Sequence, residues 1–291
     1  MDDQEWLAAH FEEHRSHLRA VAYRMLGSLD EADDALQETW LRLSRSDTSD
    51  VGNLGGWLTT IVARVCLNLL RSRNVRREES LGVHLPDPDI RPPDEEVILA
   101  DSVGLALLVV LDTLTPGERL AFVLHDMFQL PFEEIAPIVG RSPVAARQLA
   151  SRARRRVKGA ALPAADPDLV RQRQVVDAFF QAARAGDFDA LVTLLDPDVV
   201  LRADWGTRRR DAPLVVRGAA AVAAQARPIA GALTHPALVN GAAGVIVTVG
   251  GRPFAAMGFT IVEGKIVEIV AIADPARVQR LAAAVLAGDD A

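Results

Sequence analysis

Seven basic residues and no acidic one lie between Arg141 and Lys158, in a chain of 291 residues with a formal net charge of −7. A local excess of positive charge in an acidic protein suits binding to the phosphate backbone of a nucleic acid. Gln148 lies among these arginines, and arginine and glutamine side chains pair with base edges in the major groove. The residue types therefore indicate DNA recognition, while a helical hairpin with a solvated basic face remains the alternative.

Two short helices joined by Gly140-Arg141-Ser142 would position these side chains. Ser142 is placed to cap the second helix, and Pro143 falls in its first turn, where a missing N–H does no harm. Pro137 should kink or shorten the first helix. The helical wheel separates a small apolar face from a polar one. The polar face carries Val144, Arg147, Gln148, Ser151, Arg155 and Lys158, and Arg152, Arg154 and Arg156 are expected to serve phosphates or solvent.

A second basic patch, with five arginines and no acid, runs from Arg64 to Arg77. It overlaps a helix predicted over Trp57–Arg73, which follows a polar loop over Arg45–Gly56. The expected apolar stripe of this helix is Leu58, Ile61, Val62, Val65, Leu69 and Leu70. Trp57 could stack on an unpaired base, because aromatic rings bind single strands with little sequence preference. A half-buried core tryptophan is the equal alternative.

The remaining helical signals place these patches in two helical domains. Helices are expected over Gln4–Gly27 and Leu29–Ser44, with a capping box at Ser28–Glu31, and over Glu95–Leu114. Thr115–Glu118 has the form of a further capped helix start. On the Leu29–Ser44 helix, an exposed polar patch contains Asp34, Gln37 and Glu38.

Two segments read as linkers, residues 78–96 with four prolines and residues 160–166. Beyond them the pattern changes to an α+β domain with helices on one side of a curved, mostly antiparallel sheet. Its expected helices are Pro167–Ala185, Phe188–Leu195, Ala219–Arg227 and Asp274–Leu286. Its expected strands are Val199–Ala203, Leu214–Arg217, Val245–Val249, Phe254–Val262 and Ile266–Ile272, with a hairpin turn at Glu263–Lys265.

Composition excludes several classes of protein. The acidic, amphipathic N-terminus lacks the features of a signal peptide, and no apolar run is long and regular enough to span a membrane. The single cysteine, Cys66, excludes an intrachain disulfide and cannot alone form a metal site. We therefore expect a cytoplasmic protein without a metal or cofactor.

Three sequence segments resemble bacterial RNA polymerase sigma factors of the extracytoplasmic-function (ECF) class. They are ADDALQETWLRL, GWLTTIVARVCLNLLRSR and LTPGERLAFVLHDMFQLPFEEIAPIVGRSPVAARQLASRARRRV, in the expected order within residues 5–158. The last part of the chain resembles the SnoaL-like fold of the nuclear-transport-factor-2-like superfamily. Together they are similar to the sigma factor subgroup with a fused C-terminal SnoaL-like domain.

The resemblance implies a multidomain protein with two all-α domains, the second containing the helix-turn-helix, followed by an α+β cone domain. The expected boundaries are 1–77 for sigma region 2, 78–96 for a linker, 97–159 for sigma region 4, 160–166 for a second linker and 167–288 for the SnoaL-like domain. The implied partners are promoter DNA and core RNA polymerase, through its beta-prime clamp helices and beta flap. Binding of a small ligand by the C-terminal domain is a further possibility.

The resemblance also implies roles for individual residues. Contact with core polymerase falls on Asp34, Gln37 and Glu38, and contact with the minus-ten promoter element on Trp57, Arg64, Asn68 and Arg71. Contact with the minus-thirty-five promoter element is implied for Ser142, Val144, Arg147, Gln148, Ser151, Arg152 and Arg155. A regulatory contact between domains would involve His84, Leu85 and Pro86 with Asp204, Trp205, Gly206, Asp274 and Pro275. These motifs depart from the subgroup's pattern, since His84-Leu85-Pro86 replaces Trp-Leu-Pro and Asp204-Trp205-Gly206-Thr207 replaces Asp-Gly-Gly-Gly.

An enzymatic C-terminal domain, of isomerase or cyclase type, is the main alternative, with a small-molecule sensor as its non-catalytic form. Isomerase chemistry on this fold needs a carboxylate base and an oxyanion-stabilising tyrosine and acid. The only tyrosine of the chain, Tyr23, lies in the first domain. Asp198, Asp204 and His235 are the groups that could line a C-terminal cavity, but no pair of base and stabiliser can be named. We therefore expect no catalytic residues.

Overall fold

The computed structural model describes residues 3–46, 52–78, 85–93, 104–159, 166–206 and 214–287. The chain divides into two compact units. The first unit contains Met1–Leu81 and Leu108–Ala161, and the second contains Gly82–Leu107 and Leu162–Ala291. A search of the described residues finds no helix that is long and apolar enough to cross a membrane.

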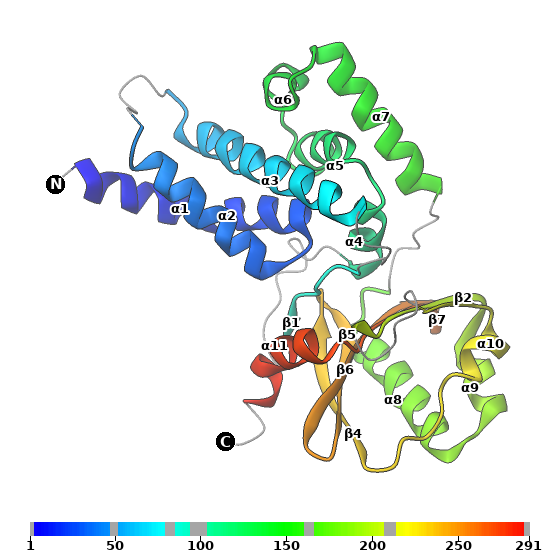
Figure 1. Ribbon diagram of the computed structural model, residues 1–291. Coiled ribbons are helices and arrows are strands. Elements are labelled where there is room, and N and C mark those ends of the chain that lie inside the picture. Colours follow the sequence, from blue (N-terminus) through cyan, green and yellow to red (C-terminus); the bar gives the residue numbers. More distant parts are fainter. Residues whose placement is uncertain are drawn as a thin grey trace. The chain divides into compact units, whose positions relative to one another are not determined.

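Three helices, α1 (Asp3–Leu26), α2 (Leu29–Leu43) and α3 (Leu54–Glu78), pack together in the first unit (Figure 1). Helix α3 begins at Leu54, so the expectation that a loop continues to Gly56 is wrong. The reason is the side chain of Asn53, whose Oδ1 accepts the N–H of Gly56 at 3.0 Å and so caps the helix. Residues 47–51 of the expected loop lie outside the described residues.

Two further details of this bundle differ from expectation. Leu67 is buried and Leu69 is 37% exposed, although the predicted stripe contained Leu69. Helix α3 contacts α1 and α2 and also the helices α5 and α6 described below, so its buried arc is wider than one stripe. Ser28 makes no side-chain capping bond, and the carboxylate of Glu31 pairs with Arg73 of α3, so the expected capping box is absent.

Helix α4 (Leu105–Asp112) spans the division at Leu108, and the first unit continues with α5 (Pro116–Phe122), the π-helix η2 (Val123–Met127), α6 (Phe132–Val139) and α7 (Pro143–Gly159). Residues 95–103 of the helix predicted from Glu95 lie outside the described residues. The capping box at the start of α5 is present between Thr115 and Glu118. Arg119 is 2% exposed and joins the two helical groups, since its Nε donates to the carbonyl of Arg24 at 3.1 Å.

The second unit is built on a seven-stranded sheet in the order β1-β4-β5-β6-β7-β2-β3. The strands are β1 (Ile90–Arg91), β2 (Leu195–Asp204), β3 (Leu214–Arg217), β4 (Ala232–Val239), β5 (Ala242–Val249), β6 (Arg252–Val262) and β7 (Lys265–Ile272). The helices are α8 (Leu169–Ala185), α9 (Phe188–Leu194), α10 (Ala219–Ala223) and α11 (Pro275–Leu286). All strand pairs are antiparallel except β2 with β7.

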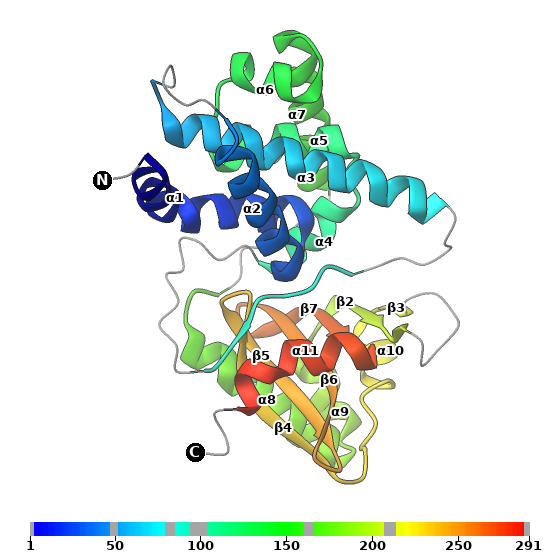
Figure 2. The same cartoon turned by 60° about the vertical axis from the view of Figure 1, so that its left-hand side comes forward.

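Helices cover both faces of this sheet, so the expectation of helices on one side is wrong. Figure 2 shows α11 in front of the sheet and α8 behind it. The α8 face holds a hydrophobic core that includes Phe179, Val245 and Phe259. The intervening residues on the other face, such as Ile246 and Ala256, are also buried. Continuous burial along a strand is the mark of a sheet that is covered on both sides.

Residues 85–93, which we call the strap, belong to the second unit and form strand β1 at the edge of its sheet. Ile90 pairs with Val239 and Arg91 with Leu238 of β4. The backbone carbonyl of Asp89 also accepts the backbone N–H of Asn240 at 2.7 Å. The interpretation of residues 78–96 as a linker rather than a packed element is therefore wrong for the strap. A two-residue strand amid prolines carries no alternating pattern, so its pairing is decided by contacts distant in sequence.

Candidate nucleic-acid interface

The turn between α6 and α7 is held by three local features. Gly140 adopts a left-handed conformation with φ of 68° and ends α6. The Oγ of Ser142 accepts the N–H of Ala145 at 3.3 Å, and Pro143 occupies the first turn of α7. Pro137 lies inside α6, which is only eight residues long. These features produce the helix-turn-helix predicted from the sequence.

Helix α7 presents one polar face to solvent. Ala146, Ala150 and Ala153 are buried against the rest of the unit. On the opposite side Val144 is 63% exposed, and Arg147, Gln148, Ser151 and Arg155 are also exposed. Small buried residues let α7 lie close to α5 and α6 while its long polar side chains extend outward. We call Ser142, Val144, Arg147, Gln148, Ser151 and Arg155 the reading face.

Three other arginines of α7 are paired with acids of the same unit. Arg156 donates to Glu118 at 2.8 Å, and Arg152 lies 3.5 Å from the same carboxylate. Arg154 pairs with Asp126 of η2. Glu118 is 4% exposed and also accepts the hydroxyl of Thr115 at 2.9 Å. The expectation that these arginines mainly serve phosphates or solvent is thus incomplete, because each contributes an ion pair to the fold.

Arg147, on the reading face, is oriented by an aromatic ring. Its guanidinium carbon lies 5.3 Å from the ring centroid of Phe132, at the start of α6. Phe132 in turn stacks on His125 at a centroid distance of 3.9 Å. A cation over an aromatic face keeps its N–H groups available at the edge of the guanidinium. Arg147 is therefore held in place yet able to donate.

A second exposed polar row runs along α3. Arg64, Asn68 and Arg71 are exposed and spaced by four and three residues, so they share one side of the helix. Trp57, seven residues before Arg64, is half-buried and lies on the same side. We call these four residues the α3 row. The row combines two cations, an amide and an aromatic ring, which suits contact with a nucleic-acid strand.

The polar patch on α2 is partly engaged by its own helix. Asp34 and Gln37 are exposed, whereas Glu38 is intermediate and accepts from Arg42 at 2.8 Å. The neighbouring Asp33 pairs with Arg19 of α1 at 2.7 Å. The acids of α2 therefore divide into those that tie the bundle together and those that face solvent.

In the second unit, Arg277 of α11 binds the strap to the sheet. Its Nε donates to Asp87 at 2.6 Å, one terminal nitrogen to Asp204 at 2.5 Å and the other to the carbonyl of Leu85 at 2.6 Å. Arg277 is 8% exposed. A buried guanidinium requires such complete pairing, because an uncompensated buried charge is costly. We call this arrangement the arginine clasp.

Several predicted interdomain residues surround this clasp. Leu85 and Pro86 are buried, and Asp274 caps α11 by accepting the N–H of Arg277 at 2.9 Å. Gly206 has a φ of 49° and lies so close to the Asp274 carboxylate that a β-carbon would overlap it. Pro275 is exposed at the start of α11, and His84 lies outside the described residues. The sequence analysis did not identify Asp87 or Arg277 as site residues, although each lies within two residues of a predicted interdomain motif.

Comparison with known proteins follows this division of the chain. Residues 10–76 match the family Sigma-70 region 2, and residues 104–157 match Sigma-70, region 4. The chain is 44% identical over 214 residues to the ECF RNA polymerase sigma factor SigJ of Mycobacterium tuberculosis, covering 72% of this chain and 68% of SigJ. The chain belongs to the ECF sigma factors. As such it directs promoter recognition in transcription initiation, and it is not an enzyme.

Two further comparisons support this ECF sigma factor assignment. A probable ECF sigma factor, SigI of M. tuberculosis, is 37% identical over 204 residues, which covers 68% of this chain and 70% of SigI. The crystal structure of M. tuberculosis SigJ superimposes with a TM-score of 0.70 at 34% identity, covering 93% of this chain and 97% of that one. The expected fold class, two helical sigma regions followed by an α+β domain, is confirmed.

Proposed function

We propose that this ECF sigma factor contacts its partners through three surfaces of the first unit. Asp34, Gln37 and Glu38 on α2 contact core polymerase, the α3 row engages the minus-ten element, and the reading face of α7 engages the minus-thirty-five element. Most of these side chains are exposed, with Glu38 and Trp57 partly buried, and their grouping by helix face supports the proposal. Within core polymerase, the beta-prime clamp helices would receive the α2 patch and the beta flap would receive region 4. The sigma factor would act in the cytoplasm, where core polymerase operates.

The second unit, in this proposal, modulates the sigma factor in cis. The observation that carries it is the arginine clasp, because Asp87 belongs to the segment that connects region 2 with region 4 along the chain. Arg173 of α8 also donates to the carbonyl of Pro93, so both ends of the strap are held. A strap fixed at two points limits how the two sigma regions can be placed on polymerase and promoter. Contacts within one chain act at high effective concentration, so even modest ones are effective.

The experiment uses the full-length Asp87→Ala variant in run-off transcription with core polymerase. This change removes the strap's carboxylate from the clasp while leaving the pair between Arg277 and Asp204, so the sheet domain keeps its buried ion pair. Hydrogen exchange of residues 85–93 reports whether the strap is released. We expect faster exchange in the strap and a transcription yield that differs severalfold from that of the unmodified protein.

Asp89→Ala provides the matched control. It removes the same charge from the same segment, but the ion pair of Asp89 is to Arg91 within the strap. Its yield should stay within about twofold of the unmodified protein. If Asp87→Ala releases the strap and transcription is unchanged over a range of protein concentrations, modulation through the strap is refuted.

A further inference from the structure

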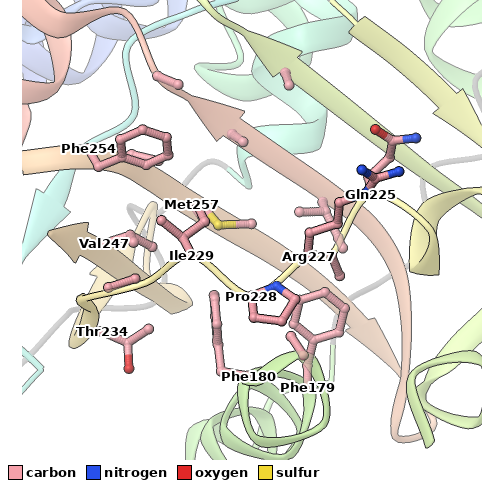
Figure 3. Close-up of a pocket in the computed structure, with 18 of the residues that line it drawn as sticks. Phe179, Phe180, Gln225, Arg227, Pro228, Ile229, Thr234, Val247, Phe254 and Met257 are labelled. Atoms are coloured by element: carbon pink, nitrogen blue, oxygen red, sulfur yellow. The ribbon is translucent and has the colours of Figure 1, made fainter. Parts of the chain in front are cut away.

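The face of the sheet that carries α8 encloses a cavity of about 600 Å³. It lies between α8, the segment 225–231 and strands of the sheet (Figure 3). In Figure 3, Phe179 and Phe180 of α8 lie on one side of this space, with Met257 of β6 and Pro228 nearby. A volume of this size lies within the range of pockets for small organic molecules.

The walls of the cavity are aromatic at two places. Phe179 and Phe180 line the cavity and form, with Phe259 behind them, a cluster of edge-to-face rings with centroids 5.5–6.0 Å apart. Trp205, which follows β2, lines the cavity and lies 6.4 Å from the ring of Phe254. Apolar walls gain dispersion contacts with an apolar ligand that fits between them. Rings on the walls favour a ligand that itself contains flat rings, since aromatic pairs gain beyond area burial.

Two arginines supply the charges of the cavity lining, and both are exposed. Figure 3 shows Arg227 beside Gln225, whereas Thr234, to which Arg184 donates at 3.4 Å, lies across the view from them. The lining, all of it within described residues, contains no acid to neutralise these cations. A negatively charged group beside Arg227 would therefore gain charge-assisted hydrogen bonds.

We propose that this cavity binds a small molecule made of two or three flat apolar rings that carry one anionic group. The rings lie between the phenylalanines of α8 and Trp205, and the anion pairs with Arg227. The site binds without catalysis, because its lining has no histidine, tyrosine, cysteine or carboxylate to move a proton. Asp198, Asp204 and His235, considered from the sequence, do not line it.

Two fluorescent probes with one ring system test both halves of the proposal. 1-Anilinonaphthalene-8-sulfonate carries the anion, and N-phenyl-1-naphthylamine is the same skeleton without it. Titration of the full-length protein should give saturable binding of both probes at one site per chain. Absence of saturable binding by either probe would overturn the proposal.

A pair of tryptophan substitutions locates the site. Ala226→Trp places bulk in the cavity, because Ala226 lines it and is partly buried. Ala224→Trp, two residues earlier, is exposed and lies outside the lining. We expect Ala226→Trp to weaken both probes at least tenfold and Ala224→Trp to leave them unchanged, with circular dichroism verifying that both variants fold. Equal binding by the two variants would place the probes elsewhere and refute the site.

Removal of charge tests the anion subsite. Arg227→Ala should weaken the sulfonate probe roughly threefold to tenfold, which corresponds to about one charge-assisted hydrogen bond. The neutral amine should bind Arg227→Ala as it binds the unmodified protein. If both probes respond equally to loss of Arg227, the anionic half of the proposal is wrong.

Discussion

Glu118 shows how one buried carboxylate can bind several basic side chains within the fold. It completes the capping box of α5 and receives Arg152 and Arg156 from α7. Together with the pair of Arg154 and Asp126, this commits three of the seven basic residues between Arg141 and Lys158 to the fold. The salt dependence of DNA binding increases with the number of basic side chains that contact phosphates. Because these three arginines are paired within the protein, that salt dependence should be weaker than the number of basic residues in the segment indicates.

The reading face of α7 leads to a prediction at Arg147. Replacing Arg147 by alanine should relax sequence preference at one position of the upstream promoter element, since a base contact contributes about 1–3 kcal/mol of discrimination. Arg154→Ala is the control, because that side chain is paired with Asp126. Electrophoretic titration against a set of single-base variants measures both. An equal loss of affinity for every sequence would show that Arg147 contacts only the backbone.

Cys66 leads to a prediction about reactivity. Burial raises the pKa of the Cys66 thiol from 9.0 to about 12, and the nearby Arg119 opposes this rise only in part. At pH 8 the reactive thiolate is thereby reduced about a thousandfold. Labelling with a disulfide reagent should be slow in the native protein and fast in denaturant. Rapid stoichiometric labelling under native conditions would contradict the burial of Cys66 in the helical unit.

Helix α2 carries acidic residues that pair within the bundle and others that face solvent and can contact a partner. Reversing the charge by Glu38→Lys should weaken binding to core polymerase roughly tenfold, since like charges at an interface are strongly unfavourable. Glu12→Lys is the matched control, because Glu12 is an exposed helical acid paired with Arg15 on α1. Fluorescence anisotropy with purified core polymerase provides the measurement. Unchanged affinity of Glu38→Lys would remove this residue from the contact.

Strand β2 serves two sites through its alternation. Ala203 and Trp205 line the cavity on one face of the sheet, whereas Asp204, between them, binds Arg277 on the other. A period of two residues requires this arrangement once the strand is placed. The alternation in the sequence of β2 could not predict which site lies on which side, because only the fold places Arg277 and α8 on opposite faces of the sheet.

Elements with strong local signals were predicted well, and those decided by distant contacts were not. The turn Glu263–Gly264 joins β6 and β7 with positive φ at both residues, as the sequence indicated. Strand β4 was missed because Thr234, His235 and Pro236 interrupt any apolar alternation. The strap was missed for a related reason, since its partner strand is remote. In the candidate interface, side chains facing solvent followed the helical wheel, but the ion pairs of α7 required knowledge of Glu118 and Asp126.

For the whole molecule, the division into two units predicts where a single substitution acts. Ile90 is 7% exposed and belongs to the second unit, although it lies between the two sigma regions in sequence. Ile90→Ala should destabilise the sheet unit by about 2–4 kcal/mol. Hydrogen exchange should show this loss in residues 166–287 and spare residues 3–78. Val215→Ala, at an exposed position of β3, should have little effect, and destabilisation confined to the sigma regions would contradict the division.

The pairing of the strap with β4 also sets an order of events during synthesis. Asp89 and its partner Asn240 are 151 residues apart. At 5–20 residues per second, a ribosome needs roughly 8–30 s to produce the second after the first. Helices α1–α3 are complete before that interval begins, and α5–α7 are made during it. Each newly made chain therefore passes once through a stage in which its sigma regions can fold before the strap has a strand to join.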